Sequence, residues 1–177
     1  MLETVENRPA AVTGGGAKIE LKNLKHSEFA SQETYCFEAS VYIDGKKAGT
    51  VSNQGCGGCH SYHPNTLYQL LKAEAAKLPP HEWRLNEEVL TIQPDADTLI
   101  SELVTEALQA KDLKSAMRRR ILFIGEDGSV YETKTLEAAV LAAQLRRPNI
   151  HEVLKTKTIL NLLPFPEALS IYIKGAK

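Results

Sequence analysis

Residues 36–53, CFEASVYIDGKKAGTVSN, decide the fold class of this 177-residue chain. Apolar residues occupy every second position from Phe37 to Ile43, which is the pattern of a strand with one buried face. Asp44-Gly45 follows at once, and Asp-Gly between alternating segments is the strongest short-range signal of a two-residue hairpin turn. The stretch therefore predicts a β-hairpin whose return strand runs from Lys46 to Val51.

Helical and strand patterns follow this hairpin in a regular order. Leucines at helical spacing predict a helix near residues 65–78, with Asn65 as its N-cap, and Val89–Gln93 is typical of a strand. A long amphipathic pattern then predicts a helix over residues 94–120, with acidic residues at its start and arginines at its end, as the helix dipole favours. The first half of the chain thus has the order hairpin, helix, strand, helix.

The second half has a similar order. We predict a hairpin that turns at Asp127-Gly128, a helix that ends near residue 147, a strand at Thr158–Leu163 and a final segment at 165–174. The final segment alternates like a strand, but its Pro-Glu-Ala-Leu opening favours a helix. The predicted fold class is therefore α+β, with antiparallel hairpins and helices in ββαβα order. This order suggests a pseudo-repeat used twice, over residues 36–110 and 120–174.

Composition indicates an ordinary folded protein. Hydrophobic residues make up 43% of the chain, charged residues 24%, and the formal net charge is −1. Residues 1–16, which contain a run of three glycines, predict a flexible arm before one α+β domain at 17–177. The start lacks the basic and apolar regions of a secretory signal, and no apolar run is long enough for a bilayer span, so we expect a cytoplasmic protein with no membrane partner.

The stretch GCGGCHSYHP, residues 55–64, carries two of the three cysteines of the chain and two of its histidines. Cys56 and Cys59 have the spacing with which two thiolates reach one zinc ion, and His63 is near enough in the chain to join them. A two-residue turn at Asp44-Gly45 pairs Cys36 with Asn53, at the mouth of the same stretch. The sequence therefore predicts, as one alternative, a zinc site formed by Cys36, Cys56, Cys59 and His63.

Other interpretations of the stretch remain open. Cys-Gly-Gly-Cys is similar to the motif of a redox-active pair, and Cys56 to His60 fits the C-x-x-C-H pattern of haem attachment. Redox pairs and haem attachment sequences, however, are typical of structural settings that differ from the one predicted for this stretch. A metal-dependent or thiol enzyme centred on Cys56, Cys59, His60 and His63 is the main catalytic alternative. We nevertheless expect no cofactor, with zinc as the alternative.

The glycines give the stretch a structural interpretation. Gly55, Gly57 and Gly58 allow a sharp bend between strand and helix, and the cysteines then become small, partly buried side chains. We expect residues 52–64 to form a binding loop in which His60, Tyr62 and His63 accompany these three glycines. Arg118, Arg119 and Arg120 form the main basic cluster, and they make nucleic-acid binding a weaker alternative.

A motif around these segments resembles a known group of sequences. The pattern S-x-E-T-x-C-F-x-A-x-V-Y-I-D-G-K-x-A-G and the following N-x-G-x-G-G loop are similar to an uncharacterised family of bacterial proteins from phages and mobile elements. The resemblance implies no known activity, and it implies an accessory role toward a host or defence protein or toward phage nucleic acid. We therefore expect a small non-catalytic binding protein, a phage-type inhibitor or modulator, whose partner is another protein.

Overall fold

The computed structural model describes residues 11–12, 16–85 and 88–175. The chain divides into two compact units, Met1–Ala107 and Leu108–Lys177, where the sequence predicted one domain over 17–177. The predicted flexible arm at 1–16 falls mainly outside the described residues, but Ala11–Val12 form a short strand, β1, that pairs with β2. The α+β fold class is confirmed.

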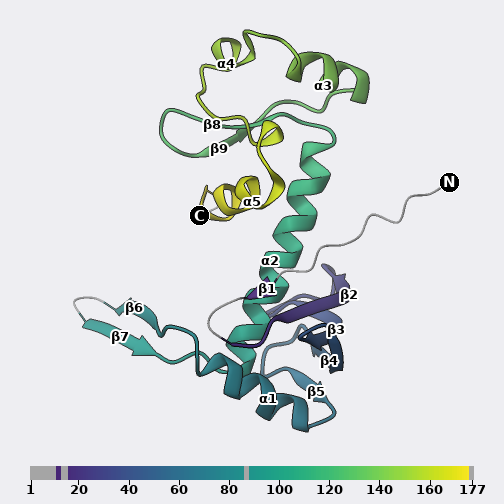
Figure 1. Ribbon diagram of the computed structural model, residues 1–177, viewed down its shortest axis with the longest axis vertical. Helices are drawn as coiled ribbons and strands as arrows, with labels where there is room; N and C mark the ends of the chain where they lie inside the picture. The colour runs from purple at the N-terminus through teal and green to yellow at the C-terminus, as the bar shows by residue number, and fades with distance from the viewer. Residues whose placement is uncertain (1–10, 13–15, 86–87, 176–177) are drawn as a thin grey trace, which may run out of the picture. The chain divides into compact units, whose positions relative to one another are not determined.

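The first unit contains a five-stranded antiparallel sheet (Figure 1). Its strands lie side by side in chain order: β1, β2 (Ile19–Ser27), β3 (Cys36–Ile43), β4 (Lys46–Gln54) and β5 (Ser61–His63). The predicted hairpin is formed by β3 and β4. Asp44 and Gly45 have φ angles of 51° and 78°, as a type I′ turn requires, and Asp-Gly accepts this conformation at low cost.

The pairing of β3 with β4 shifts by one residue part of the way along the hairpin. Tyr42 lies opposite Lys47, but Val41 lies opposite Gly49, so Ala48 is an extra residue in β4. The predicted pairing of Cys36 with Asn53 is therefore wrong, and Cys36 lies opposite Gln54 instead. Because a one-residue shift exchanges the two faces of a strand, the bulge turns Val51 and Asn53 toward the buried face.

Two helices and a second hairpin complete the first unit. They are α1 (Thr66–Ala75), β6 (His81–Leu85), β7 (Glu88–Ile92) and the start of α2 (Ala96–Met117). The predicted strand at 89–93 is β7, and it pairs with β6. Asn65 is the N-cap residue of α1, as predicted, although its side chain makes no cap hydrogen bond. Asp95 caps α2 with its side chain, since its Oδ1 accepts the main-chain N–H of Thr98 at 2.8 Å.

Apolar side chains from the sheet and the helices form the core of the first unit. Phe37, Val41 and Val51 of the sheet are buried, as are Leu67 of α1 and Leu103 of α2. Alternate positions on β3 and β4 supply the sheet side of the core, and positions at helical spacing supply the other side. Residues 55–64, which we call the glycine stretch, follow β4 and include the edge strand β5. The stretch therefore passes through an edge strand before the helix and is not a direct strand-to-helix loop.

The second unit departs from the predicted repeat. Beyond the last part of α2 it contains β8 (Leu122–Ile124), β9 (Val130–Glu132), α3 (Ala138–Leu145), α4 (Ile150–Val153), the 3-10 helix η1 (Leu160–Leu162) and α5 (Phe165–Gly175). The hairpin at Asp127-Gly128 and the final helix are confirmed. The strand predicted at 158–163 is wrong: Ile159 makes a single bridge to Phe123, and a 3-10 turn follows.

The physical reason lies in the packing of this segment. Leu160 is fully buried in a cluster with Leu113, Leu122 and Leu169, and the 3-10 turn places it there. Asn161 Oδ1 accepts the N–H of Leu122 at 2.8 Å, so a side chain takes the place of a strand partner. In the described part of the chain, no helix is both long enough and apolar enough to cross a membrane.

Candidate functional site

The glycine stretch is organised around the buried amide of Asn53, which is 5% exposed. Its Oδ1 accepts the N–H of Gly55 at 2.8 Å and the hydroxyl of Thr34 at 2.8 Å. Its Nδ2 lies 3.2 Å from the carbonyl oxygen of Gly58 and 3.0 Å from Nδ1 of His60. Because Gly55 N–H is an obligatory donor, the orientation of the amide is fixed, and Nδ2 must donate to both of its neighbours.

This orientation also fixes the protonation of His60. Nδ1 accepts a hydrogen bond from Asn53, so the proton of the neutral ring is on Nε2, which lies 3.0 Å from Ser101 Oγ. Burial lowers the pKa of His60, while the charge of Asp97 acts in the opposite direction. Protonation of Nδ1 would place two donors against each other at Asn53, which also favours the neutral ring.

The pair of His60 and Ser101 is therefore not an activated nucleophile. In a serine nucleophile the imidazole accepts the hydroxyl proton, and a carboxylate holds the proton on the other nitrogen. Here Nε2 is the donor and Ser101 Oγ is the acceptor, so the serine proton has no base at this ring. His60 acts as a positioning residue that ties the glycine stretch to α2.

Asp97, in the first turn of α2, is the second connection between the helix and the stretch. Its Oδ1 accepts the hydroxyl of Tyr62 at 2.6 Å and the main-chain N–H of His60 at 3.2 Å. Burial, the hydrogen bond to Asp97 and its charge together raise the pKa of Tyr62, so the phenol stays protonated. The same carboxylate raises the pKa of the Cys59 thiol through a hydrogen bond and its charge.

The raised pKa of Cys59 bears on the thiol-enzyme hypothesis. The thiolate is the reactive form of cysteine, and reactive cysteines sit beside positive groups that lower the pKa. Cys59 instead lies beside a carboxylate. Its environment is therefore the reverse of what an activated thiol requires.

The predicted zinc ligands are not brought together. His63 pairs with Thr50 of β4, and Cys36 pairs with Gln54 of β4. Thr50 and Gln54 are four residues apart, about 13 Å along the strand, so His63 and Cys36 lie far from each other. Cys36 is partly buried, as the structural interpretation expected, but Cys56 and Cys59 are exposed, so that expectation is wrong for these two. Within residues 11–12, 16–85 and 88–175, no group of three or more His, Cys, Asp or Glu side chains has the geometry to hold a metal ion.

The three glycines of the stretch allow a sharp bend of the backbone, as the sequence predicted. Gly55, Gly57 and Gly58 have φ angles of 86°, 84° and 84°, in the region that favours glycine. A Cβ on Gly55 would collide with the carbonyl oxygen of Ala30 and lie 2.9 Å from Cys36 Cβ. The stretch therefore packs closely against residues 30–36, and this contact depends on glycine.

Residues 27–36 form a turn that is held against the stretch. The main-chain N–H groups of Gln32, Glu33 and Thr34 all donate to the carbonyl oxygen of Gly55, at 2.9, 2.9 and 3.3 Å. Ser31 Oγ donates to the carbonyl oxygen of Ser27 at 2.8 Å and accepts the N–H of Cys36 at 2.8 Å. We call this segment the anchored turn.

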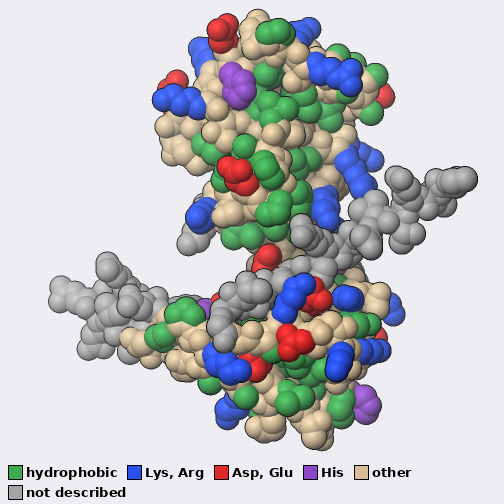
Figure 2. Space-filling view, in the orientation of Figure 1, with side chains coloured by type: hydrophobic (Ala, Val, Ile, Leu, Met, Phe, Trp, Pro, Cys, Tyr) green, Lys and Arg blue, Asp and Glu red, His purple; other side chains and the backbone are tan. Residues whose placement is uncertain are grey.

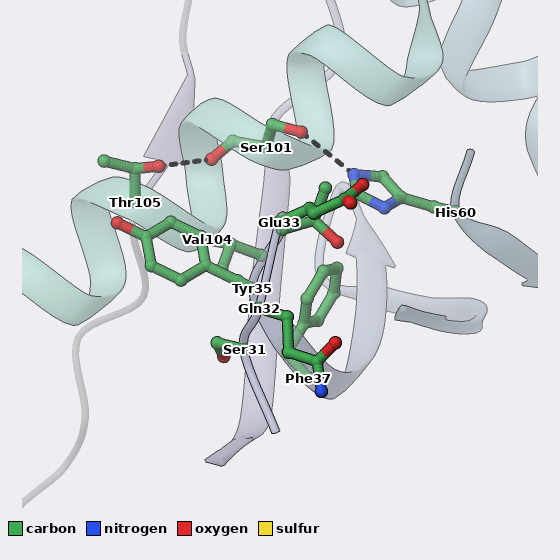
Figure 3. A pocket seen from close by; sticks show the side chains of 10 residues that line it. Ser31, Gln32, Glu33, Tyr35, Phe37, His60, Ser101, Val104 and Thr105 are labelled. Carbon is green, nitrogen blue, oxygen red and sulfur yellow. Dashed lines mark hydrogen bonds between the residues drawn. The ribbon is translucent and has the colours of Figure 1, made fainter. Parts of the chain in front are cut away.

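A pocket of about 310 Å³ opens between the anchored turn and α2 (Figure 3). The side chains of Glu33 and Tyr35 come from the turn, those of Ser101 and Thr105 come from the helix, and His60 lies at one side, where its ring contacts Ser101. Gly55, Gly57 and Gly58, which the sequence placed in the binding loop, do not line this pocket, but the Gly55 carbonyl oxygen holds the turn and Gly57 lies against Glu33. Tyr62 is tied to Asp97, and His63 lies on the edge strand.

Sequence reasoning missed the residues that complete this site. Ser101 and Asp97 lie about 40 residues from the stretch, and their helical pattern gave no sign that they contact it. Asn53 had a signal, since it is the first residue of the N-x-G-x-G-G motif. Glu33 and Tyr35 fall within the other quoted motif, but only the fold places them at a pocket.

The predicted basic cluster lies in the second unit. Arg118 and Arg119 are exposed, whereas Arg120 forms an ion pair with Glu132. On the face shown in Figure 2, basic and acidic side chains are interspersed among the described residues. The ion pair of Arg120 leaves Arg118 and Arg119 as the exposed members of the predicted cluster.

Comparison with models of protein families, with curated proteins and with solved structures found no match.

Proposed function

We propose that this chain is a non-catalytic binding protein whose recognition surface is the anchored turn together with the glycine stretch that supports it. The observation that carries the proposal is Phe29, which is 99% exposed at the tip of the anchored turn. Burial of an exposed phenylalanine ring by a partner is strongly favourable, and aromatic residues are enriched at the centres of protein interfaces.

The rigidity of the anchored turn supports this role. Hydrogen bonds through Ser31 and through the Gly55 carbonyl hold both ends of the turn, so Phe29 is presented on a fixed backbone. Tyr35, at the other end of the turn, is 42% exposed. Ordering a flexible segment weakens binding, and a pre-organised turn avoids most of that cost.

The charge around the site favours a basic protein as the partner. The segments 28–36, 52–64 and 93–106 contain no lysine or arginine. They carry six carboxylates, at Glu28, Glu33, Asp95, Asp97, Glu102 and Glu106. A surface of this sign repels the phosphate backbone of nucleic acids and steers a positively charged protein toward it.

The family resemblance suggests what such binding achieves. We propose that the chain modulates or inhibits a host or defence protein in the cytoplasm, as the phage-type sequence motifs imply. The saturated hydrogen bonds of Asn53 and the donor role of His60 support a recognition role over catalysis.

The test is capture of a partner by the full chain, immobilised and exposed to a bacterial lysate. A partner of net positive charge should be retained by the wild type and by Leu70→Ala, and lost with Phe29→Ala. Leu70 is a matched control because it is also an exposed apolar side chain, 53% exposed, but lies on α1. The captured protein is then purified, and its affinity is measured by calorimetry.

Binding that survives Phe29→Ala would contradict the proposal, and so would turnover of a small molecule by the purified chain. A truncation of an exposed interface anchor should weaken binding by about 2 kcal/mol or more, which is about thirtyfold.

A further inference from the structure

The pocket between the anchored turn and α2 has a lining whose chemistry favours one class of ligand. It has a volume of about 310 Å³, which is at the lower end of the range for small-ligand sites and suits a single side chain. All of its lining residues belong to the first unit. Among the described residues, its lining includes Glu33 but no lysine or arginine.

The main-chain N–H groups and the imidazole N–H near the pocket are already in use, and the donors that remain are the neutral side chains of Gln32, Tyr35 and Ser101. The N–H groups of Gln32, Glu33 and Thr34 point to the Gly55 carbonyl oxygen and not into the pocket. The Nε2 proton of His60 is directed at Ser101 Oγ, 3.0 Å away. A carboxylate or a phosphate would therefore find only neutral donors here and no cationic side chain among the lining residues.

Acceptors, in contrast, remain available. Glu33 contributes a carboxylate whose Oε2 lies against Gly57, and no ion pair or hydrogen bond to this carboxylate occurs among residues 11–12, 16–85 and 88–175. Thr105 Oγ1 donates to the Ser101 carbonyl oxygen at 2.8 Å and keeps its lone pairs for an incoming donor. Acceptors from the turn and from α2 thus face the pocket from two sides (Figure 3).

Aromatic rings supply the remaining surface. Tyr35, Phe37 and His60 line the pocket, and the rings of Phe37 and His60 meet edge to face with centroids 5.2 Å apart. A planar cation stacks favourably on such rings. A guanidinium group combines a flat face with five N–H donors around its edge, whereas an ammonium group is a compact, strongly hydrated charge.

We propose that this pocket binds the guanidinium group of an arginine side chain on the protein partner. The inference rests on the proposed function and deepens it. Glu33 forms the ion pair, Thr105 accepts a further hydrogen bond, and Tyr35 provides the stacking face. The pocket begins two residues from Phe29, so the partner segment presents an arginine beside the hollow that takes the phenylalanine ring.

The experiment needs no partner. The full chain, labelled with nitrogen-15, is titrated with N-acetyl-L-arginine amide while the backbone amide signals are followed by NMR. We expect saturable shifts at Tyr35, His60 and Ser101, with a dissociation constant on the order of 1 mM for so small a ligand. The citrulline analogue, which has nearly the same shape without the charge, should bind at least about tenfold more weakly.

Matched variants locate the interaction. Glu33→Gln should weaken arginine binding at least about tenfold, and Glu28→Gln should leave it unchanged. Glu28 is a suitable control because it lies in the same turn, is exposed and does not line the pocket. Thr105→Val should weaken binding less than Glu33→Gln does, since it removes one neutral acceptor.

Three results would overturn the inference: no saturable shifts with arginine, equal binding of citrulline or lysine amide, or equal losses in Glu33→Gln and Glu28→Gln. Its failure is distinguishable from failure of the proposed function. If a partner is captured through Phe29 but arginine does not bind, only the pocket assignment fails. If arginine binds but no partner depends on Phe29, the pocket assignment holds and the proposed function fails.

Discussion

The inner and outer sides of the candidate site differ in how their polar groups are used. On the inner side, Asn53, His60 and Asp97 bond to one another or to the nearby backbone, and each side chain has a defined role in the packing. On the outer side, Phe29 and Glu33 face solvent, and no partner within the described residues occupies them. The inner residues therefore hold the shape of the site, and the outer ones are available for recognition.

Asn53→Ala should have the largest effect on stability. The substitution leaves the buried N–H of Gly55 and the Thr34 hydroxyl without their acceptor, and it removes the donor to His60. We expect a loss of about 3 kcal/mol in the free energy of unfolding, measured by urea denaturation. Ser52→Ala, one residue earlier and on the opposite face of β4, should cost much less. A loss below about 1 kcal/mol for Asn53→Ala would show that the inner network is not what holds the site.

Gly55→Ala should come next, and Gly58→Ala is its matched control. Both residues have φ near 85°, so both substitutions carry the backbone cost of about 1 kcal/mol that alanine incurs in this region. Only at Gly55 does the new Cβ also collide with Ala30 and Cys36, whereas nothing lies within 4 Å at Gly58. We expect about 3 kcal/mol at Gly55 against about 1 kcal/mol at Gly58, by the same denaturation experiment. Equal losses would mean that the anchored turn moves away freely.

Acid should weaken the inner side through His60. Burial lowers the pKa of this ring in the folded state, so the unfolded chain takes up the proton more readily. The stability contribution is therefore complete above about pH 6.5 and is lost as the pH falls through the lowered folded pKa. Urea midpoints at about pH 7.5 and about pH 5 measure the loss, and His60→Gln should reduce it. The same loss in wild type and variant would assign the effect to other groups.

Changing Asn53 to aspartate should move the proton of the His60 ring from Nε2 to Nδ1. A carboxylate at this position accepts from Nδ1, so the pKa of His60 should rise and Nε2 should become able to act as a base toward Ser101. An NMR titration of the His60 ring signals in Asn53→Asp and in wild type measures the change. An unchanged pKa would contradict the hydrogen-bond directions that exclude an activated serine.

Substitutions on the outer side should have the smallest effect on folding. Phe29→Ala removes a fully exposed ring, and Glu33→Gln changes the charge but not the size of an exposed side chain that makes no hydrogen bond or ion pair within the described residues. We therefore expect changes within about 0.5 kcal/mol. Thermal melts monitored by circular dichroism measure this, and the same variants lose binding in the experiments above. A large loss of stability at Phe29 would show that the ring packs against the protein, and it would remove the main support for a recognition role.

The local signals of the chain were reliable where neighbours in sequence are also neighbours in space. The type I′ turn at Asp44-Gly45 depends on two residues that accept positive φ, and the alternating strand depends on one buried face. The capping of α2 by Asp95 and the positive φ angles of Gly55, Gly57 and Gly58 are of the same kind. In each case the energetic preference is contained in a few consecutive residues.

The candidate site was predictable only in part for the same reason. The sequence directed attention to residues 52–64, but it gave most weight to the cysteines and histidines as ligands. Their positions depend on the bulge at Ala48, on the edge strand β5 and on Asp97, which reaches the stretch from α2. None of these is visible in the spacing C-x-x-C-H-x-x-H, because spacing describes local reach and not the direction in which a side chain points.

The sequence alone thus specifies the α+β class, the first hairpin, the long helix and a glycine stretch that must bend. Contacts between distant segments decide the rest. One extra residue in β4 puts Asn53 on the buried face, where an amide must satisfy its hydrogen bonds. Thr34 and His60 are its side-chain partners there. The turn that carries Phe29 and lines the pocket is itself held to this arrangement by the Gly55 carbonyl oxygen.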